Sequence, residues 1–367
     1  MIRIARHFII ITIVVAAIVV IIAALFGVQS NILKSLLYGK QQQVSAKVTS
    51  PLLRLIERIP IPNVNGRIDH MAIDTVGREK LLFVAEIENN SLDVIDLNTS
   101  KRIHSISNSG LLNEPQGVVF IPEFDRIFVS NGQDGSVDIF DPKTFSLIKK
   151  VKLSSDDADN LRYDSNSKLV YVGYGEGAIS ILNTSNYNVV GDIKLTGHPE
   201  SFQVEEQKFL EGKHRIFVNI PSSNSVVVVE SKKHIVLATW PLTNAQNNFP
   251  MALDEANHRL FVGTRDPAKL LVFDTDSGKL ISSLDIANDP DDIFYDAAKK
   301  RIYVSCGEGF INIFQQQSPN QYGTIANILT AAGARTSLFV PELNRFYLAV
   351  PHLGNQQSEI LVYQVGQ

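Results

Sequence analysis

The chain has 367 residues, of which 44% are hydrophobic and 20% are charged, so it can bury a large core and lacks the composition of a disordered protein. Its formal net charge of -4 disfavours nucleic acid as a partner, because phosphate binding depends on clustered Lys and Arg. Cys306 is the only cysteine, which excludes an intrachain disulfide, and its apolar neighbours indicate an inert core residue.

The first expected element is a membrane anchor over residues 1–28, whose apolar part covers residues 8–28. That stretch is long enough to cross a hydrocarbon layer of about 30 Å as one helix. Because Arg3 and Arg6 precede it, we expect a cytoplasmic N-terminus and an exported remainder, periplasmic or extracellular. The alternative is a signal peptide cut after Ser30, but about 21 apolar residues exceed the usual signal core, which favours an uncleaved anchor.

Residues 29–52 form the expected linker, because they contain three consecutive glutamines and several serines without sustained periodicity. From residue 53 onward, short runs rich in Val, Ile and Phe alternate with turn residues to the end of the chain, which is typical of strands. Residues 53–367 are therefore predicted to form one all-β domain.

A short aromatic phrase recurs seven times within this domain, at spacings of 42 to 46 residues. It is centred on Phe83, Phe128, Tyr171, Phe217, Phe261, Tyr303 and Tyr347. A strand-rich repeat of this period predicts a seven-bladed β-propeller with four strands in each blade. The inner strands are expected to include residues 70–74, 160–164, 251–255 and 292–296.

The last repeat ends directly after its third strand, at residues 359–365. The segment at residues 55–62 resembles a fourth strand and precedes the first inner strand, without a blade of its own. We therefore predict that this N-terminal strand pairs with residues 359–365 and closes the ring, which removes two exposed sheet edges.

The repeat resembles that of the YVTN-repeat, or YncE-like, seven-bladed propellers. The resemblance is carried by YVG at Tyr171, FVG at Phe261 and YVS at Tyr303, and by the strand ends VIDL and VFDT. Over residues 55–367 it implies the propeller architecture and an exported protein, but it implies no activity, because a fold does not determine function. Single-stranded DNA binding, which is associated with this group, is disfavoured here by the acidity of the chain.

The loops before the inner strands and those between second and third strands should emerge together at one mouth of the central channel. They carry ten candidate ligand-binding residues: Asp69, His70, Gln116, Asp159, Asn160, His198, Glu200, Asp292, Arg335 and Arg265. The same ring includes Phe249, Asp291 and Thr336. Turn chemistry accounts for neighbours such as Asp289, and polar lining of a water-filled channel is the alternative interpretation of the whole set.

Two kinds of ligand fit these residues. Asp69, Asn160, Glu200 and Asp292 are candidate ligands for one divalent metal ion. Oxygen ligands suit calcium or magnesium, whereas participation of His70 and His198 would favour zinc. Arg265 and Arg335 could instead clamp a carboxylate or phosphate with paired N–H donors.

The sequence contains no nucleophile elbow, phosphate-binding loop, metalloprotease helix or haem-attachment motif. We therefore expect a membrane-tethered, monomeric propeller that binds a small molecule or a protein through the channel mouth. The alternative is a metal-dependent lactonase-type hydrolase, similar in outline to gluconolactonase-like propellers. In that case a cation at the mouth would polarise a carbonyl group, with His70 or His198 as general base.

Overall fold

The computed structural model describes residues 52–77, 80–107, 110–205 and 214–366. The expected membrane anchor and all but the last residue of the expected linker lie outside these ranges. None of the helices within the described ranges is both long enough and apolar enough to cross a membrane.

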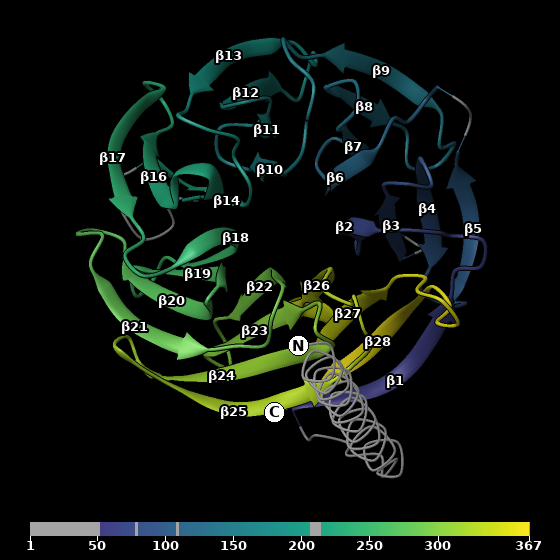
Figure 1. Ribbon diagram of the computed structural model, residues 1–367. Coiled ribbons are helices and arrows are strands. Elements are labelled where there is room, and N and C mark those ends of the chain that lie inside the picture. Colours follow the sequence, from purple (N-terminus) through teal and green to yellow (C-terminus); the bar gives the residue numbers. More distant parts are fainter. Residues whose placement is uncertain (1–51, 78–79, 108–109, 206–213, 367) are drawn as a thin grey trace, which may run out of the picture. The chain divides into compact units, whose positions relative to one another are not determined.

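The described chain folds into seven antiparallel four-stranded sheets that surround a central channel (Figure 1). Blade 1 consists of β2 (Ile68–Asp74), β3 (Leu81–Glu86), β4 (Ser91–Asp96) and β5 (Lys101–Ile106). Blade 2 consists of β6 (Pro115–Ile121), β7 (Arg126–Asn131), β8 (Ser136–Phe140) and β9 (Leu147–Lys152). Blade 3 consists of β10 (Leu161–Asp164), β11 (Leu169–Tyr174), β12 (Ala178–Asn183) and β13 (Val189–Lys194).

Blade 4 consists of β14 (Phe202–Val204), β15 (Arg215–Ile220), β16 (Ser225–Glu230) and β17 (Ile235–Pro241). Blade 5 consists of β18 (Gln246–Asp254), β19 (Arg259–Asp266), β20 (Ala268–Asp274) and β21 (Leu280–Asp285). Blade 6 consists of β22 (Pro290–Asp296), β23 (Arg301–Cys306), β24 (Phe310–Ser318) and β25 (Gln321–Leu329). Two short 3-10 turns, η1 (Pro221–Ser223) and η2 (Pro341–Leu343), lie between strands.

Blade 7 joins the two ends of the propeller. It consists of β26 (Ser337–Val340), β27 (Arg345–Val350), β28 (Glu359–Val365) and, at its outer edge, β1 (Leu53–Pro60). β1 runs antiparallel to β28, with Leu53 opposite Val365 and Pro60 opposite Glu359. The predicted closure is therefore confirmed, although the strand begins two residues earlier than the sequence suggested. The pairing covers the edge of β28, the last strand, and makes β1 the outer strand of the blade.

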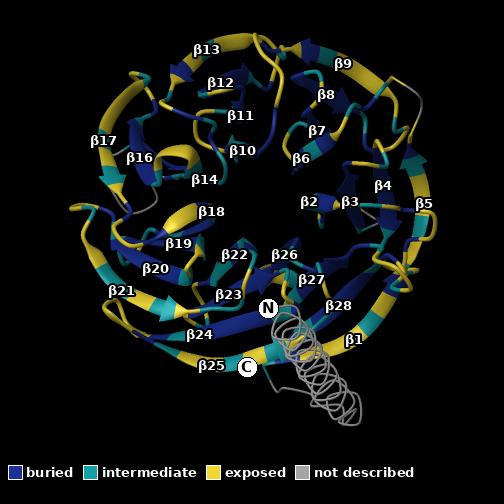
Figure 2. Cartoon of the chain, viewed as in Figure 1, coloured by how far each residue is buried: buried dark blue, intermediate teal, exposed yellow. Residues whose placement is uncertain are grey.

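The repeated aromatic residues seal the interfaces between blades. Phe83 in β3 of blade 1 lies 5.9 Å from Phe120 in β6 of blade 2, measured between ring centroids. Tyr303 in β23 of blade 6 lies 5.6 Å from Phe339 in β26 of blade 7. The second strands are almost wholly buried, while the outermost strands expose several of their residues (Figure 2). The period of the repeat therefore reflects one aromatic residue per blade that packs against the neighbouring blade.

Candidate binding cavity at the channel mouth

Four inner strands begin with a β-bulge, and these bulges shape the mouth of the channel. The register with the second strand shifts in β2, β6, β18 and β22, within the segments 68–71, 115–118, 248–251 and 290–292. A bulge interrupts the alternation of side chains along a strand and changes the direction in which the neighbouring side chains point. The bulged segments contain His70, Gln116, Phe249 and Asp291, which all reach one cavity.

This cavity has a volume of about 190 Å³, enough for one small ligand. All ten sequence-predicted site residues line it: Asp69, His70, Gln116, Asp159, Asn160, His198, Glu200, Arg265, Asp292 and Arg335. Phe249, Asp291 and Thr336 line it as well. Three further lining residues, Arg67, Asp157 and Ser201, are not singled out by the sequence. The structure thus brings the predicted residues together around one cavity.

No strand pattern accounts for the three residues that sequence reasoning missed. Arg67 precedes β2, and Asp157 lies outside the strands with a φ of 55°, so the alternation of side chains along a strand applies to neither. Asp157 is identified only by its contact with His198, and Ser201 has no comparable signal.

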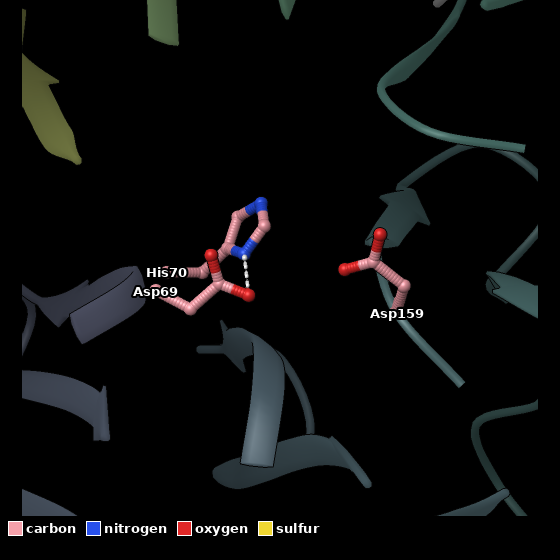
Figure 3. A group of neighbouring side chains, drawn as sticks. All are labelled: Asp69, His70 and Asp159. Atoms are coloured by element: carbon pink, nitrogen blue, oxygen red, sulfur yellow. Dashed lines mark ion pairs between the residues drawn. The ribbon is translucent and has the colours of Figure 1, made fainter. Parts of the chain in front are cut away.

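His70 is the centre of the cavity wall formed by blades 1 and 3. Its Nε2 lies 3.0 Å from Oδ1 of Asn160, and its Nδ1 lies 3.6 Å from Oδ2 of Asp69 (Figure 3). Burial by itself would lower the pKa of His70, but the charges of Asp69, Asp159 and Asp292 outweigh it and raise that pKa to about 9. Burial likewise opposes ionisation of Asp69, yet the charge of His70 keeps the pKa of Asp69 below its usual value.

His198 stands in the adjacent loop and contacts two carboxylates. Its Nδ1 lies 2.6 Å from the Gly175 carbonyl oxygen and 3.2 Å from Oδ2 of Asp157, and its Nε2 lies 3.8 Å from Oδ2 of Asp159. Burial opposes protonation, but the nearby Asp159 carboxylate, the hydrogen bond to Gly175 and the charge of Asp157 raise the pKa of His198 to about 9. Both imidazoles are therefore held beside carboxylates.

Glu200 and Asp292 are carboxyl groups whose environment favours the protonated form. Burial and the neighbouring charge of Asp159 raise the pKa of Glu200 to about 8. Burial also raises the pKa of Asp292 to about 7, against the opposing effect of His70. Asp292 Oδ2 accepts a hydrogen bond of 2.6 Å from the Ser337 amide. A cation that entered the cavity would stabilise the ionised forms of both groups.

The opposite wall, from blades 5 to 7, is a network of two arginines and two aspartates. Arg335 lies 2.7 Å from Asp289 and 3.1 Å from Asp291, and Arg265 lies 3.1 Å from Asp289 and also pairs with Asp291. The Arg265 guanidinium stacks on Phe249, 3.7 Å from the ring centroid. Each guanidinium group is thus already matched by carboxylates, which disfavours the anion clamp expected from Arg265 and Arg335.

Asp289 has a larger part in this wall than turn chemistry alone implies. Its φ of 58° is indeed the left-handed conformation that Asp adopts in turns. Both of its carboxylate oxygens also accept hydrogen bonds from Arg335, at 2.8 and 2.7 Å. Assigning Asp289 to turn formation alone was therefore incomplete.

The metal-ligand atoms that lie closest together differ from the expected set. Within the described residues, Asp69, His70 and Asp159 each offer one ligand atom within 4.8 Å of the other two. Figure 3 shows the Asp159 carboxylate facing His70 and Asp69 across the gap. Of the four residues expected to bind a metal, only Asp69 belongs to this group. Asn160 contacts the far nitrogen of His70 instead.

Gly117 allows the chain to place Asp159 at the cavity. A Cβ atom at Gly117 would clash with the main-chain oxygen of Asp159 and lie 2.8 Å from Oγ of Ser130. Ser130 Oγ donates to that same oxygen of Asp159 and accepts a 2.8 Å hydrogen bond from the Gly117 amide. The absence of a side chain at this position therefore lets blades 2 and 3 approach closely.

The comparisons with known proteins give distant relatives. The chain is 22% identical over 61% of its length to Antigen Lp49 of Leptospira interrogans, and 19% identical over 52% of its length to the uncharacterized protein YncE of Salmonella typhimurium. It spans about half the length of each relative, 50% and 54% respectively. No family model matches the sequence.

Two solved structures share the architecture. A chain of the Kuenenia stuttgartiensis hydrazine synthase superposes with a TM-score of 0.68 at 16% identity, covering 82% of this chain and 97% of that one. A chain of a mitotic checkpoint complex also gives 0.68, at 12% identity, covering 84% of this chain and 94% of its own. At such low identity these likenesses show the fold alone. The seven four-stranded blades and the distant YncE relative together support the similarity of this chain to the YncE-like β-propellers.

Proposed function

We propose that this protein is an exported, membrane-tethered binding module that takes a small, positively charged ligand into the channel-mouth cavity. The observation that carries the proposal is the uneven distribution of charge around the cavity. Arg265 and Arg335 are matched by Asp289 and Asp291 on one wall. The remaining lining carries five carboxyl groups against one guanidinium and two imidazoles, namely Asp69, Asp157, Asp159, Glu200 and Asp292 against Arg67, His70 and His198.

The burial of these carboxyl groups supports a ligand rather than bulk water as their partner. Asp159 and Asp69 are only 6% and 9% exposed, so water alone solvates them poorly. Buried carboxylates normally need a paired cation or several hydrogen-bond donors. Protons held by His70, His198 and Glu200 balance these carboxyl groups at neutral pH, and an ammonium, an amidine or a metal ion would take the place of those protons. The cavity volume favours a small ligand over the folded surface of a protein.

Calorimetric titration of the full-length chain in mild detergent tests the proposal with three small probes that differ in charge: putrescine, citrate and glucose. Putrescine should bind most tightly, and its affinity should fall with added salt, because the attraction is electrostatic. Asp159→Asn should weaken putrescine binding by about tenfold, which corresponds to about 1.4 kcal/mol. Tighter binding of citrate, or equal binding of all three probes, would contradict the proposal.

The tether is tested separately by cell fractionation and by the mass of the mature chain. An uncleaved anchor requires the intact chain in the membrane fraction, released by detergent but not by high salt. A soluble chain shortened by about 30 residues would instead support signal cleavage.

A metal-dependent hydrolase is the second candidate function, favoured by the grouping of Asp69, His70 and Asp159. A cation there would polarise a lactone carbonyl and activate water, and His198, beside Asp159, would serve as the base once it is deprotonated. Purified protein supplied with zinc, manganese or calcium should then open simple lactones. No acceleration with any of these ions would eliminate this candidate.

A further inference from the structure

We infer that Asp69, His70 and Asp159 bind one divalent transition-metal ion, with the Nδ1 atom of His70 as its nitrogen ligand. This inference rests on the proposed cation-binding cavity and identifies the ligand class at its most buried wall. The three residues come from two blades, Asp69 and His70 from β2 and Asp159 from the segment before β10.

The first support is an unsatisfied atom. Nδ1 of His70 is buried and has no hydrogen-bond partner among the described residues. Its nearest charged neighbour, Oδ2 of Asp69, lies at 3.6 Å, which is too long for a hydrogen bond. Buried polar atoms are rarely left without a partner, so this atom points to a group that a bare protein chain lacks.

The spacing of the ligand atoms is the second support. Two atoms bound to one tetrahedral zinc ion at about 2.1 Å stand about 3.4 Å from each other. The 3.6 Å separation of His70 Nδ1 and Asp69 Oδ2 is close to that value. Asp159 offers an oxygen within 4.8 Å of one ligand atom on each of these two residues and would have to move closer by about 1 Å. Water could then complete the coordination from the open side of the cavity.

Asn160 supplies the outer contacts that such a site needs. Its Oδ1 lies 3.0 Å from Nε2 of His70 and can accept the proton there, which leaves the lone pair on Nδ1. Its Nδ2 donates to Oδ2 of Asp159 at 3.3 Å. One side chain therefore orients two of the three proposed ligands. We assign Asn160 as a positioning residue and not as the metal ligand that its sequence position suggested.

The donor set selects the class of metal. One imidazole and two carboxylates suit zinc, manganese or iron, whereas calcium and magnesium prefer an all-oxygen shell. Zinc is the practical probe for affinity, and cobalt reports the coordination geometry through its visible absorption. Calcium serves as the contrasting hard cation.

Zinc titration by calorimetry, on the full-length chain in detergent after removal of metals, tests the assignment. Wild type should bind one zinc ion per chain, more tightly than calcium. His70→Ala and Asp69→Asn should each weaken zinc binding by about 100-fold or more. Asp285→Asn is the matched control, because it removes one carboxylate that is exposed at the end of β21 and does not line the cavity. Its zinc affinity should stay within about threefold of wild type.

The role of Asn160 is tested through geometry as well as affinity. Asn160→Ala should weaken zinc binding by about 10-fold or more and broaden the visible spectrum of the cobalt-loaded protein. Asn160→Asp keeps the acceptor for Nε2 of His70 and should restore most of the affinity. Circular dichroism establishes that each variant is folded.

Absence of zinc binding by folded wild type, or equal loss in Asp69→Asn and Asp285→Asn, would overturn the metal assignment. Putrescine binding by the same sample would then leave the cation-binding cavity standing, whereas loss of both would remove the proposed function as well.

Discussion

Replacing the buried Glu86 with glutamine should stabilise the propeller at neutral pH. Glu86, at the end of β3, is fully buried, and its Oε2 accepts hydrogen bonds from Ser91 and from Asn89. Its Oε1 and Oδ1 of the neighbouring Asp93 both lack a hydrogen-bond donor among the described residues. Arg102 donates a hydrogen bond of 2.7 Å to the other oxygen of Asp93. A proton on Glu86 therefore satisfies both orphaned oxygens.

The magnitude follows from that proton. Burial and the charge of Asp93 raise the pKa of Glu86 to about 9 from 4.5. Protonated Glu86 contributes its full stabilisation below pH 4.5, which is the pKa of this group in the unfolded chain. As the pH rises toward the folded-state pKa of about 9, that stabilisation is lost, because the unfolded chain releases the proton first. Each pH unit in that window is worth about 1.4 kcal/mol, so the loss at pH 7 is about 3 kcal/mol. Glutamine offers an N–H donor without this loss.

Urea unfolding of wild type and Glu86→Gln at pH 5, 7 and 8.5 measures the effect. The two proteins should have similar free energies of unfolding at pH 5 and diverge by about 3 kcal/mol at pH 7. Blade 2 supplies the mirror control, because Asn131 occupies the equivalent place and donates to Ser136 and Asp138. Asn131→Asp should lose stability as pH rises. A pH-independent difference in Glu86→Gln would refute this reasoning.

Three further predictions concern the ring and the cavity. Deleting residues 1–62 should lower the melting temperature sharply, since it removes β1 and exposes the edge of β28; an unchanged calorimetric melting curve would refute the role of the closure. Gly117→Ala should destabilise the fold by about 1–3 kcal/mol in urea unfolding and weaken cation binding, because the new Cβ meets Asp159, whereas no change in either would show that the blades can part without cost. Arg335→Ala should cost about 2 kcal/mol or more by leaving Asp289 and Asp291 underpaired, and unaltered stability would show that Arg265 suffices.

The fold was predictable because the sequence of each blade contains the same aromatic strand motif. The aromatic residue of every second strand is needed to seal one interface, so the period of the sequence equals the period of the structure. The closing strand was predictable from what the last blade lacked. Its bounds were not, because the burial of Leu53, at the start of β1, depends on contacts with a blade more than 200 residues away.

The location of the cavity was predictable, because aligned inner strands place equivalent residues at one mouth. The ion pairs and hydrogen bonds among the lining residues were not predictable. Arg335 and Asp289 are separated by 46 residues and meet only because blades 6 and 7 are neighbours. The part played by Asn160 depends on its contact with His70, 90 residues earlier in the chain, and no local pattern encodes that contact.

The sign of the charge that the cavity accepts is the central claim, and anomalous diffraction from crystals soaked in caesium chloride or in sodium iodide tests it most directly. Both ions scatter strongly and carry little chemical preference beyond their charge. A cavity that selects cations should show a caesium peak beside Asp69 and Asp159 and no iodide peak. Iodide bound between Arg265 and Arg335, with caesium found only elsewhere, would contradict it.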